Sequence, residues 1–136
     1  MTSDEQAPAW VEQMLDQLAA AGFSVVQARG SGTVNRKVEL RRADFAVRVT
    51  ADRGQWWVEG GLPDGSAWYD AGVWQTCLLG APAVGLGTSE EAAYFVAHHG
   101  ELAAAASRPG FRLGLAQCRE RRARERLGLP LHGGQD

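Results

Sequence analysis

The chain has 136 residues, 45% of them hydrophobic, and a formal net charge of −2. This length suits one compact domain, and no run approaches the roughly 20 apolar residues that a membrane helix needs. The N-terminal segment MTSDEQAPAW is acidic where an export signal would be basic, so we expect a cytoplasmic protein with no membrane partner.

The first predicted element is an amphipathic helix in residues 8–22, where apolar side chains recur at helical spacing. Residues 23–29, FSVVQAR, predict a strand because β-branched residues are frequent there. In the segment TVNRKVELRR that follows, Val34, Val38 and Leu40 alternate with polar residues. This alternation predicts an antiparallel strand with one face in the core and the other in solvent.

Two further strands and a chain reversal are predicted next. The segment DFAVRVT alternates apolar and polar residues, ADRG supplies a turn, and QWWVEG predicts a fourth strand. The segment LPDGS contains the residue types of a tight reversal. Sequential strands joined by short turns predict a meander.

Residues 70–79, DAGVWQTCLL, are compatible with two structures. The alternation around Trp74 fits a strand, or a strand that becomes a turn, and this is the structure that we predict. A short helix is the alternative, with Asp70 as its N-cap and with Trp74 and Leu78 one turn apart. The segment GAPAVGLG that follows predicts a loop.

Two C-terminal helices complete the predicted fold. The segment TSEEAAYFVAHHGELAAAA opens with a serine cap and two acidic residues, which the helix dipole favours in a first turn. The segment GFRLGLAQCRERRARERLGLP pairs arginine and glutamate at helical spacing. The predicted class is α+β over residues 1–130, with an N-terminal helix, an antiparallel meander of four to five strands, and C-terminal helices packed on one face of the sheet. Residues 131–136 predict a frayed tail.

Charges are segregated along the chain. Residues 54–107 contain six acidic residues and no lysine or arginine, whereas residues 108–126 contain seven arginines and two glutamates. Such asymmetry shapes the surface field and the rate of association, so we expect the acidic segment to meet a basic partner. The arginines predict a solvated, salt-bridged helix face rather than a nucleic-acid site, because glutamates are interspersed among them.

Few residues suggest catalysis or metal binding. His98 and His99 are neighbours on a predicted helix and point about 100° apart, so they cannot easily share one ion. We expect His99 to be a buried, hydrogen-bonded histidine. Cys77 and Cys118 form no CxxC pair, and we expect reduced thiols, with Cys77 inert in the core. We predict no catalytic residue, no metal and no cofactor.

An acidic residue pair and two glycine-rich segments are best explained by structural roles rather than by catalysis or phosphate binding. Asp64 and Asp70 flank Trp68, and glycosidases use paired carboxylates beside aromatic platforms, but a small meander rarely holds a sugar-sized cleft. The segment GSGTVNR joins two strands, and GAPAVGLG lacks the lysine and hydroxyl of a phosphate loop. We therefore predict a binding protein rather than an enzyme.

The aromatic segment GQWWVEGGLPDGSAWYD has the most unusual composition in the chain. In a strand Trp56 and Trp57 point to opposite faces, so only one of them can join a given core face. We predict that Trp57 faces outward. Exposed tryptophan and tyrosine are frequent anchors of protein interfaces, so this segment is a candidate docking surface.

The pattern FAVRV…DRGQWWVEGG…WYD…VWQTCLLG…SEEAAYFVAHHGELAAA resembles small immunity proteins of bacterial polymorphic-toxin systems, within residues 23–106. This resemblance implies a single α+β domain that binds and neutralises a cognate toxin, such as a basic nuclease-like domain. No catalytic residue carries over from it. The acidic, aromatic surface that we expect to contact the toxin comprises Trp57, Glu59, Asp64, Trp68 and Asp70.

Two other classes of function stay open at this point. The order of helix, meander and helices also resembles secretion chaperones, which would bind an extended segment of an exported client. An enzyme is the third class, and it would need a polar cluster in a pocket. A toxin gene beside the coding sequence would favour immunity, whereas a secretion operon would favour the chaperone.

Overall fold

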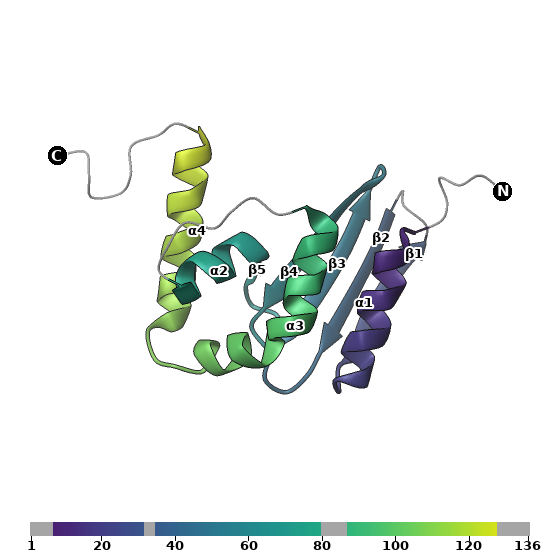
Figure 1. Ribbon diagram of the computed structural model, residues 1–136, viewed down its shortest axis with the longest axis horizontal. Helices are drawn as coiled ribbons and strands as arrows, with labels where there is room; N and C mark the ends of the chain where they lie inside the picture. Colours follow the sequence, from purple (N-terminus) through teal and green to yellow (C-terminus); the bar gives the residue numbers. More distant parts are fainter. Residues whose placement is uncertain (1–6, 32–34, 80–86, 128–136) are drawn as a thin grey trace.

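The computed structural model describes residues 7–31, 35–79 and 87–127 (Figure 1). One helix precedes an antiparallel sheet in the order β1-β2-β3-β4-β5, and three helices follow it, which confirms the predicted α+β meander. The elements are α1 (Ala9–Ala20), β1 (Ser24–Ser31), β2 (Asn35–Arg41), β3 (Ala46–Asp52), β4 (Gln55–Gly61), β5 (Trp68–Asp70), α2 (Ala71–Leu79), α3 (Thr88–Ala106) and α4 (Phe111–Leu127).

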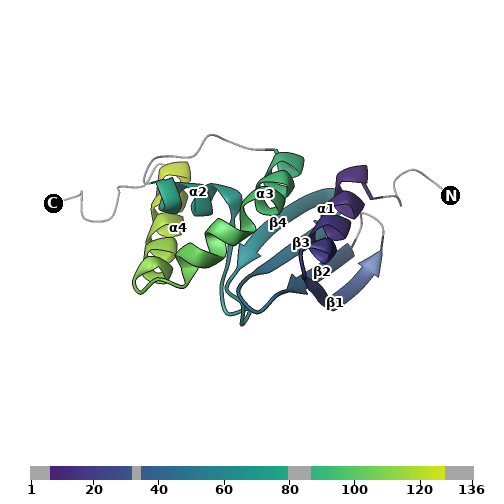
Figure 2. The ribbon, with the colours of Figure 1, turned by 60° about the horizontal axis from the view of Figure 1, so that its bottom comes forward.

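Helices α1 and α3 lie side by side on one face of the sheet, and α2 and α4 lie beyond its β5 edge (Figures 1 and 2). The core fills the space between the sheet and these helices. A Cβ added at Gly60 of β4 would lie 2.5 Å from Phe95 and 2.8 Å from Phe45, so glycine is what lets these rings pack against the strand. The largest fully buried side chains include Trp74, Phe45, Phe95, Met14 and Leu18.

A two-residue turn between β3 and β4 sets the register of the aromatic strand. Arg53 and Gly54 both have positive φ, 54° and 83°, as a type I′ turn requires. The ring of Trp56 packs edge-on against Trp10 of α1, with centroids 5.8 Å apart. Trp57 points to the opposite face and is 45% exposed, which confirms its predicted orientation.

The sheet face opposite α1 and α3, here called the open face, carries polar side chains in cross-strand rows. One row is Arg29, Lys37, Thr50 and Trp57, and the next is Gln27, Glu39, Arg48, Glu59 and Asp70. The predicted alternation of β2 holds for Val38 and Leu40, which are buried, while Val34 lies outside the described residues. Glu39 was expected in solvent but is buried, and it forms an ion pair of 2.6 Å with Arg41.

The prediction of a strand for residues 70–79 was wrong, because only Asp70 belongs to β5 and the rest form α2. Asp70 caps this helix by accepting the Val73 N–H through Oδ1 at 2.9 Å. Ala71, Gly72, Val73 and Trp74 are all buried, so the helix has no polar face to produce a helical pattern in the sequence.

The predicted helices α3 and α4 are present, but the cap of α3 differs from the prediction. Its N-cap is Gly87 rather than a serine, and Glu90 Oε1 accepts the Gly87 N–H at 2.9 Å. In α4, Arg124 and Glu120 form the expected pair at 3.4 Å. The predicted loop at 80–87, apart from Gly87, and the predicted tail at 131–136 lie outside the described residues.

Helices α2 and α4 bring the two cysteines together. Both are free thiols, Cys118 buried and Cys77 half-buried. Burial and the neighbouring Cys118 thiol raise the pKa of Cys77 to about 11. At neutral pH the Cys77 thiol is therefore protonated and poorly nucleophilic, which agrees with the inert role expected for it. In the described part of the chain, no helix has the length and apolar character that a membrane crossing requires.

Gly100 is expected to destabilise α3, and its replacement by alanine should stabilise the protein. It is exposed, and a Cβ added there would meet no atom outside the helix's own backbone within 4 Å. Because alanine favours the helix and restricts the unfolded chain, Gly100→Ala should raise the free energy of unfolding by about 1 kcal/mol. Urea denaturation followed by circular dichroism measures the change, with Gly60→Ala as the control that should destabilise. No gain from Gly100→Ala would contradict the prediction.

Candidate partner-binding site

A cavity of about 290 Å³ lies beside β4 where the three-residue strand β5 ends, and it is bordered by α3 and α4. Four of the five residues predicted to bind a partner line it, namely Trp57, Glu59, Trp68 and Asp70. The other lining residues are Val58, Tyr69, Val73, Glu91, Arg119, Arg122 and Ala123. The structure therefore brings together most of the predicted surface, and it adds residues from both C-terminal helices.

Asp64 is the predicted site residue that does not line this cavity. It lies in the turn between β4 and β5, where its Oδ1 accepts the Ser66 N–H at 3.0 Å. The side chain of Ser66, and then this backbone N–H, lower the pKa of the Asp64 carboxyl by hydrogen bonding to it. The turn itself accounts for an aspartate at this position.

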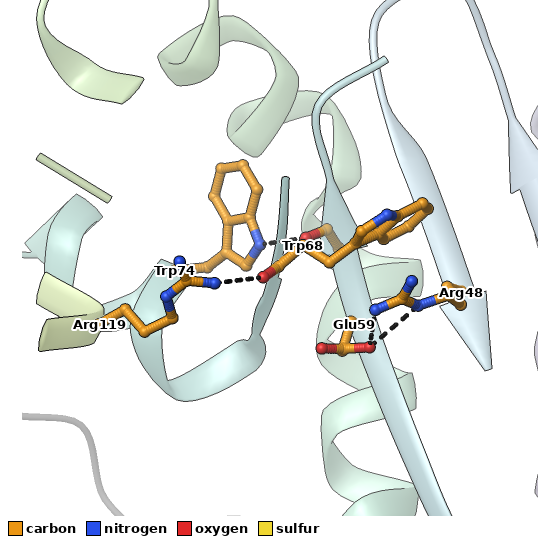
Figure 3. Close-up of polar contacts among 6 residues, drawn as sticks. Arg48, Glu59, Trp68, Trp74 and Arg119 are labelled. Atoms are coloured by element: carbon orange, nitrogen blue, oxygen red, sulfur yellow. Dashed lines mark hydrogen bonds and ion pairs between the residues drawn. The ribbon is translucent and has the colours of Figure 1, made fainter. Parts of the chain in front are cut away.

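Arg48 joins Glu59 and Trp68 on the open face (Figure 3). Its guanidinium donates to Glu59 Oε1 at 2.6 and 3.0 Å, and the guanidinium carbon lies 4.4 Å from the Trp68 ring centroid. The register of β3 and β4 places Arg48 directly opposite Glu59. Glu59 is therefore already paired within the protein, and Trp68 is held over the sheet by a cation–π contact.

Arginines of α4 reach the other side of β5. The guanidinium carbon of Arg119 lies 4.8 Å from the Tyr69 ring centroid, and its Nη1 donates to the Trp68 carbonyl at 3.4 Å (Figure 3). Arg122 lies against Gly72, and its buried Nε has no hydrogen-bond partner among the described residues. The surface expected to be acidic and free of positive charge is thus of mixed charge, because the arginine-rich helix packs beside it.

Glu91, in the first turn of α3, faces the same cavity. Burial raises the pKa of its carboxyl to about 7, and the negative charges of Asp70 and, more weakly, Glu59 raise it further. The Ala71 N–H and the Arg122 guanidinium act in the opposite direction. Burial is the largest of these causes, so the net shift is upward and Glu91 exchanges its proton near neutral pH.

The titration of Glu91 gives a stability prediction with a definite sign. Its pKa is about 7 in the folded protein against 4.5 for an unperturbed glutamate, so the folded state binds more protons between those pH values. The free energy of unfolding should therefore decrease as pH rises from about 4.5 to about 7. Denaturation at a series of pH values measures this slope, and Glu91→Gln should reduce it.

Carbon NMR of the Glu91 carboxyl provides the direct check. Asp70→Asn is the matched variant, because asparagine can still cap α2 while the neighbouring charge is removed. The pKa of Glu91 should fall in this variant. An ordinary glutamate pKa in the unmodified protein would contradict the assigned environment.

The histidines lie away from this cavity. His98 contacts Glu101 at 3.0 Å, and His99 packs edge-on against Phe23 with ring centroids 5.3 Å apart. The prediction for His99 was correct in part: the residue is half-buried, but its Nδ1 has no hydrogen-bond partner among the described residues. Burial lowers the pKa of His99. In the same part of the chain, no three His, Cys, Asp or Glu side chains are grouped as metal ligands would be.

Sequence reasoning missed four charged residues of the site, Arg48, Glu91, Arg119 and Arg122. Arg48 could have been found, because a two-residue turn at 53–54 pairs it with Glu59. The contrast between an acidic segment and the arginine-rich helix after it was a second signal, since opposite charges favour contact between the two.

No protein-family model matches the chain, and searches of curated proteins and of solved structures likewise found no match.

Proposed function

We propose that this protein is an immunity protein, which binds a cognate toxin and neutralises it through the surface around Trp57. The observation that carries the proposal is the exposure of this side chain: 45% of Trp57 is accessible on the open face. Trp57 also lines three neighbouring hollows, so a partner could enclose its ring from several sides. A large aromatic side chain in this setting is a typical anchor of a tight interface.

The residues around Trp57 support a binding surface that is ordered before the partner arrives. Arg48 holds Glu59 by two hydrogen bonds and lies over Trp68, while Arg119 lies over Tyr69. Side chains that are already ordered lose less conformational entropy on association. The resemblance to immunity proteins of polymorphic-toxin systems, together with this ordered aromatic surface, favours a folded protein as the partner.

Co-expression with the protein encoded by the adjacent reading frame tests the proposal. If that frame encodes a toxin, the chain should restore growth of the host, and the two purified proteins should form a stoichiometric complex in size-exclusion chromatography. Growth arrest in the presence of the folded chain would overturn immunity. Binding only to an unfolded or extended form of the neighbouring protein would indicate a chaperone instead.

A further inference from the structure

Two cations stand directly opposite each other on the open face, Arg29 of β1 and Lys37 of β2. Side chains of such a cross-strand pair project beside one another, and like charges in this position destabilise a sheet. Among the described residues, neither cation forms an ion pair with a carboxylate. Thr50 and Trp57 continue the same row, so the exposed tryptophan and the two cations share one surface.

The nearby carboxylates do not neutralise this pair. In the adjacent row, Glu39 is engaged by Arg41 and Glu59 by Arg48, each at 2.6 Å. A hollow of about 370 Å³ lies over this part of the sheet. Its lining consists of Arg29, Lys37, Arg48, Thr50, Trp57 and Glu59. The open face therefore has a cationic zone with an aromatic wall, in a chain whose net charge is −2.

We propose that this zone binds an acidic segment of the protein partner, with carboxylates on Arg29 and Lys37 and an apolar side chain against the ring of Trp57. The inference specifies the chemistry of the partner surface and in that respect rests on the proposed function. It also changes the expected charge of that surface, because a purely basic toxin face would be repelled by the two unpaired cations.

A polypeptide carboxylate fits the zone better than a nucleic-acid backbone. The hollow is lined by two unpaired cations, and acidic side chains border them on the same face. Glu59 lines the hollow, and Asp52 lies two residues beyond Thr50 on β3, opposite Gln55. A continuous phosphate chain would extend over these acids, whereas a short acidic segment can end before them. The net negative charge of the protein opposes long polyanions in the same way.

The test uses the isolated protein and its single lysine. Lys37 is the only lysine in the chain, so reductive methylation with ¹³C gives one side-chain NMR signal from this zone and preserves the charge. Titration with a short peptide of alternating glutamate and leucine should shift the Lys37 signal and change the tryptophan fluorescence. Arg29→Gln should weaken this binding about fivefold or more. Arg108→Gln removes the same charge at an exposed position outside the sheet and should leave binding unchanged.

Three outcomes would overturn the inference: no shift of the Lys37 signal at saturating peptide, equal weakening by Arg29→Gln and Arg108→Gln, or tighter binding of oligothymidylate than of the peptide. The last outcome would identify a nucleic-acid site. Circular dichroism confirms that each variant is folded. Because the peptide titration needs no toxin, a negative protection experiment beside a positive titration would reject immunity and retain the acidic-segment site.

Discussion

Replacing Trp74 with alanine is expected to lower the free energy of unfolding by about 3–5 kcal/mol, a large part of the stability of a domain of this size. Trp74 is fully buried and packs edge-on against Phe45 and Tyr69, with ring centroids 5.2 and 6.2 Å apart. It also stacks with Phe111 of α4 at 6.3 Å. Removal of the indole would leave a cavity at the point where β4, α2 and α4 meet.

A hydrogen bond adds to the effect of Trp74 and can be separated from it. The indole Nε1 donates to the Gly60 carbonyl at 3.0 Å inside the core (Figure 3). Trp74→Phe keeps an aromatic ring but leaves that carbonyl without its donor, so this variant should lose about 1–3 kcal/mol. Chemical denaturation of both variants measures the two contributions. A loss below about 1 kcal/mol for Trp74→Ala would show that the ring is not packed as described.

The meander could be predicted because its signals are local. Alternation placed Val47 and Val49 of β3 on the core face, and both are fully buried. The turn at Arg53 and Gly54 has two residues, so it also determines which residues of β3 and β4 stand opposite each other. The strand positions and the outward side of Trp57 follow from these two patterns.

Helix α2 and the charge of the site could not be predicted in the same way, because both depend on distant contacts. Trp74 is buried by partners from the sheet and from α4, and four consecutive buried residues, 71–74, leave this helix without a clear amphipathic pattern. Arg119 reaches Tyr69 only because α4 packs beside α2. The acidic segment therefore has no positive charge in sequence but contacts several arginines in space.

If the proposed function is correct, Trp57→Ala should weaken toxin binding by about 30- to 1,000-fold, which corresponds to about 2–4 kcal/mol. The ring projects from the open face and lines the cavity that is also lined by Trp68 and Asp70. A partner that covers it would remove a large apolar area from water, and alanine offers almost none of that area. Isothermal titration calorimetry of the purified complex measures the loss.

The same substitution should change folding stability by less than about 1 kcal/mol, because much of the Trp57 side chain is already in solvent. A docking residue such as Trp57 should therefore affect toxin affinity much more than folding stability. A core residue such as Trp74 should mainly affect folding stability. Leu113→Ala provides the matched control for exposed apolar area, since Leu113 is 63% exposed on α4 and does not line the cavity. Equal losses of affinity in Trp57→Ala and Leu113→Ala, or none in either, would show that the toxin docks on another surface.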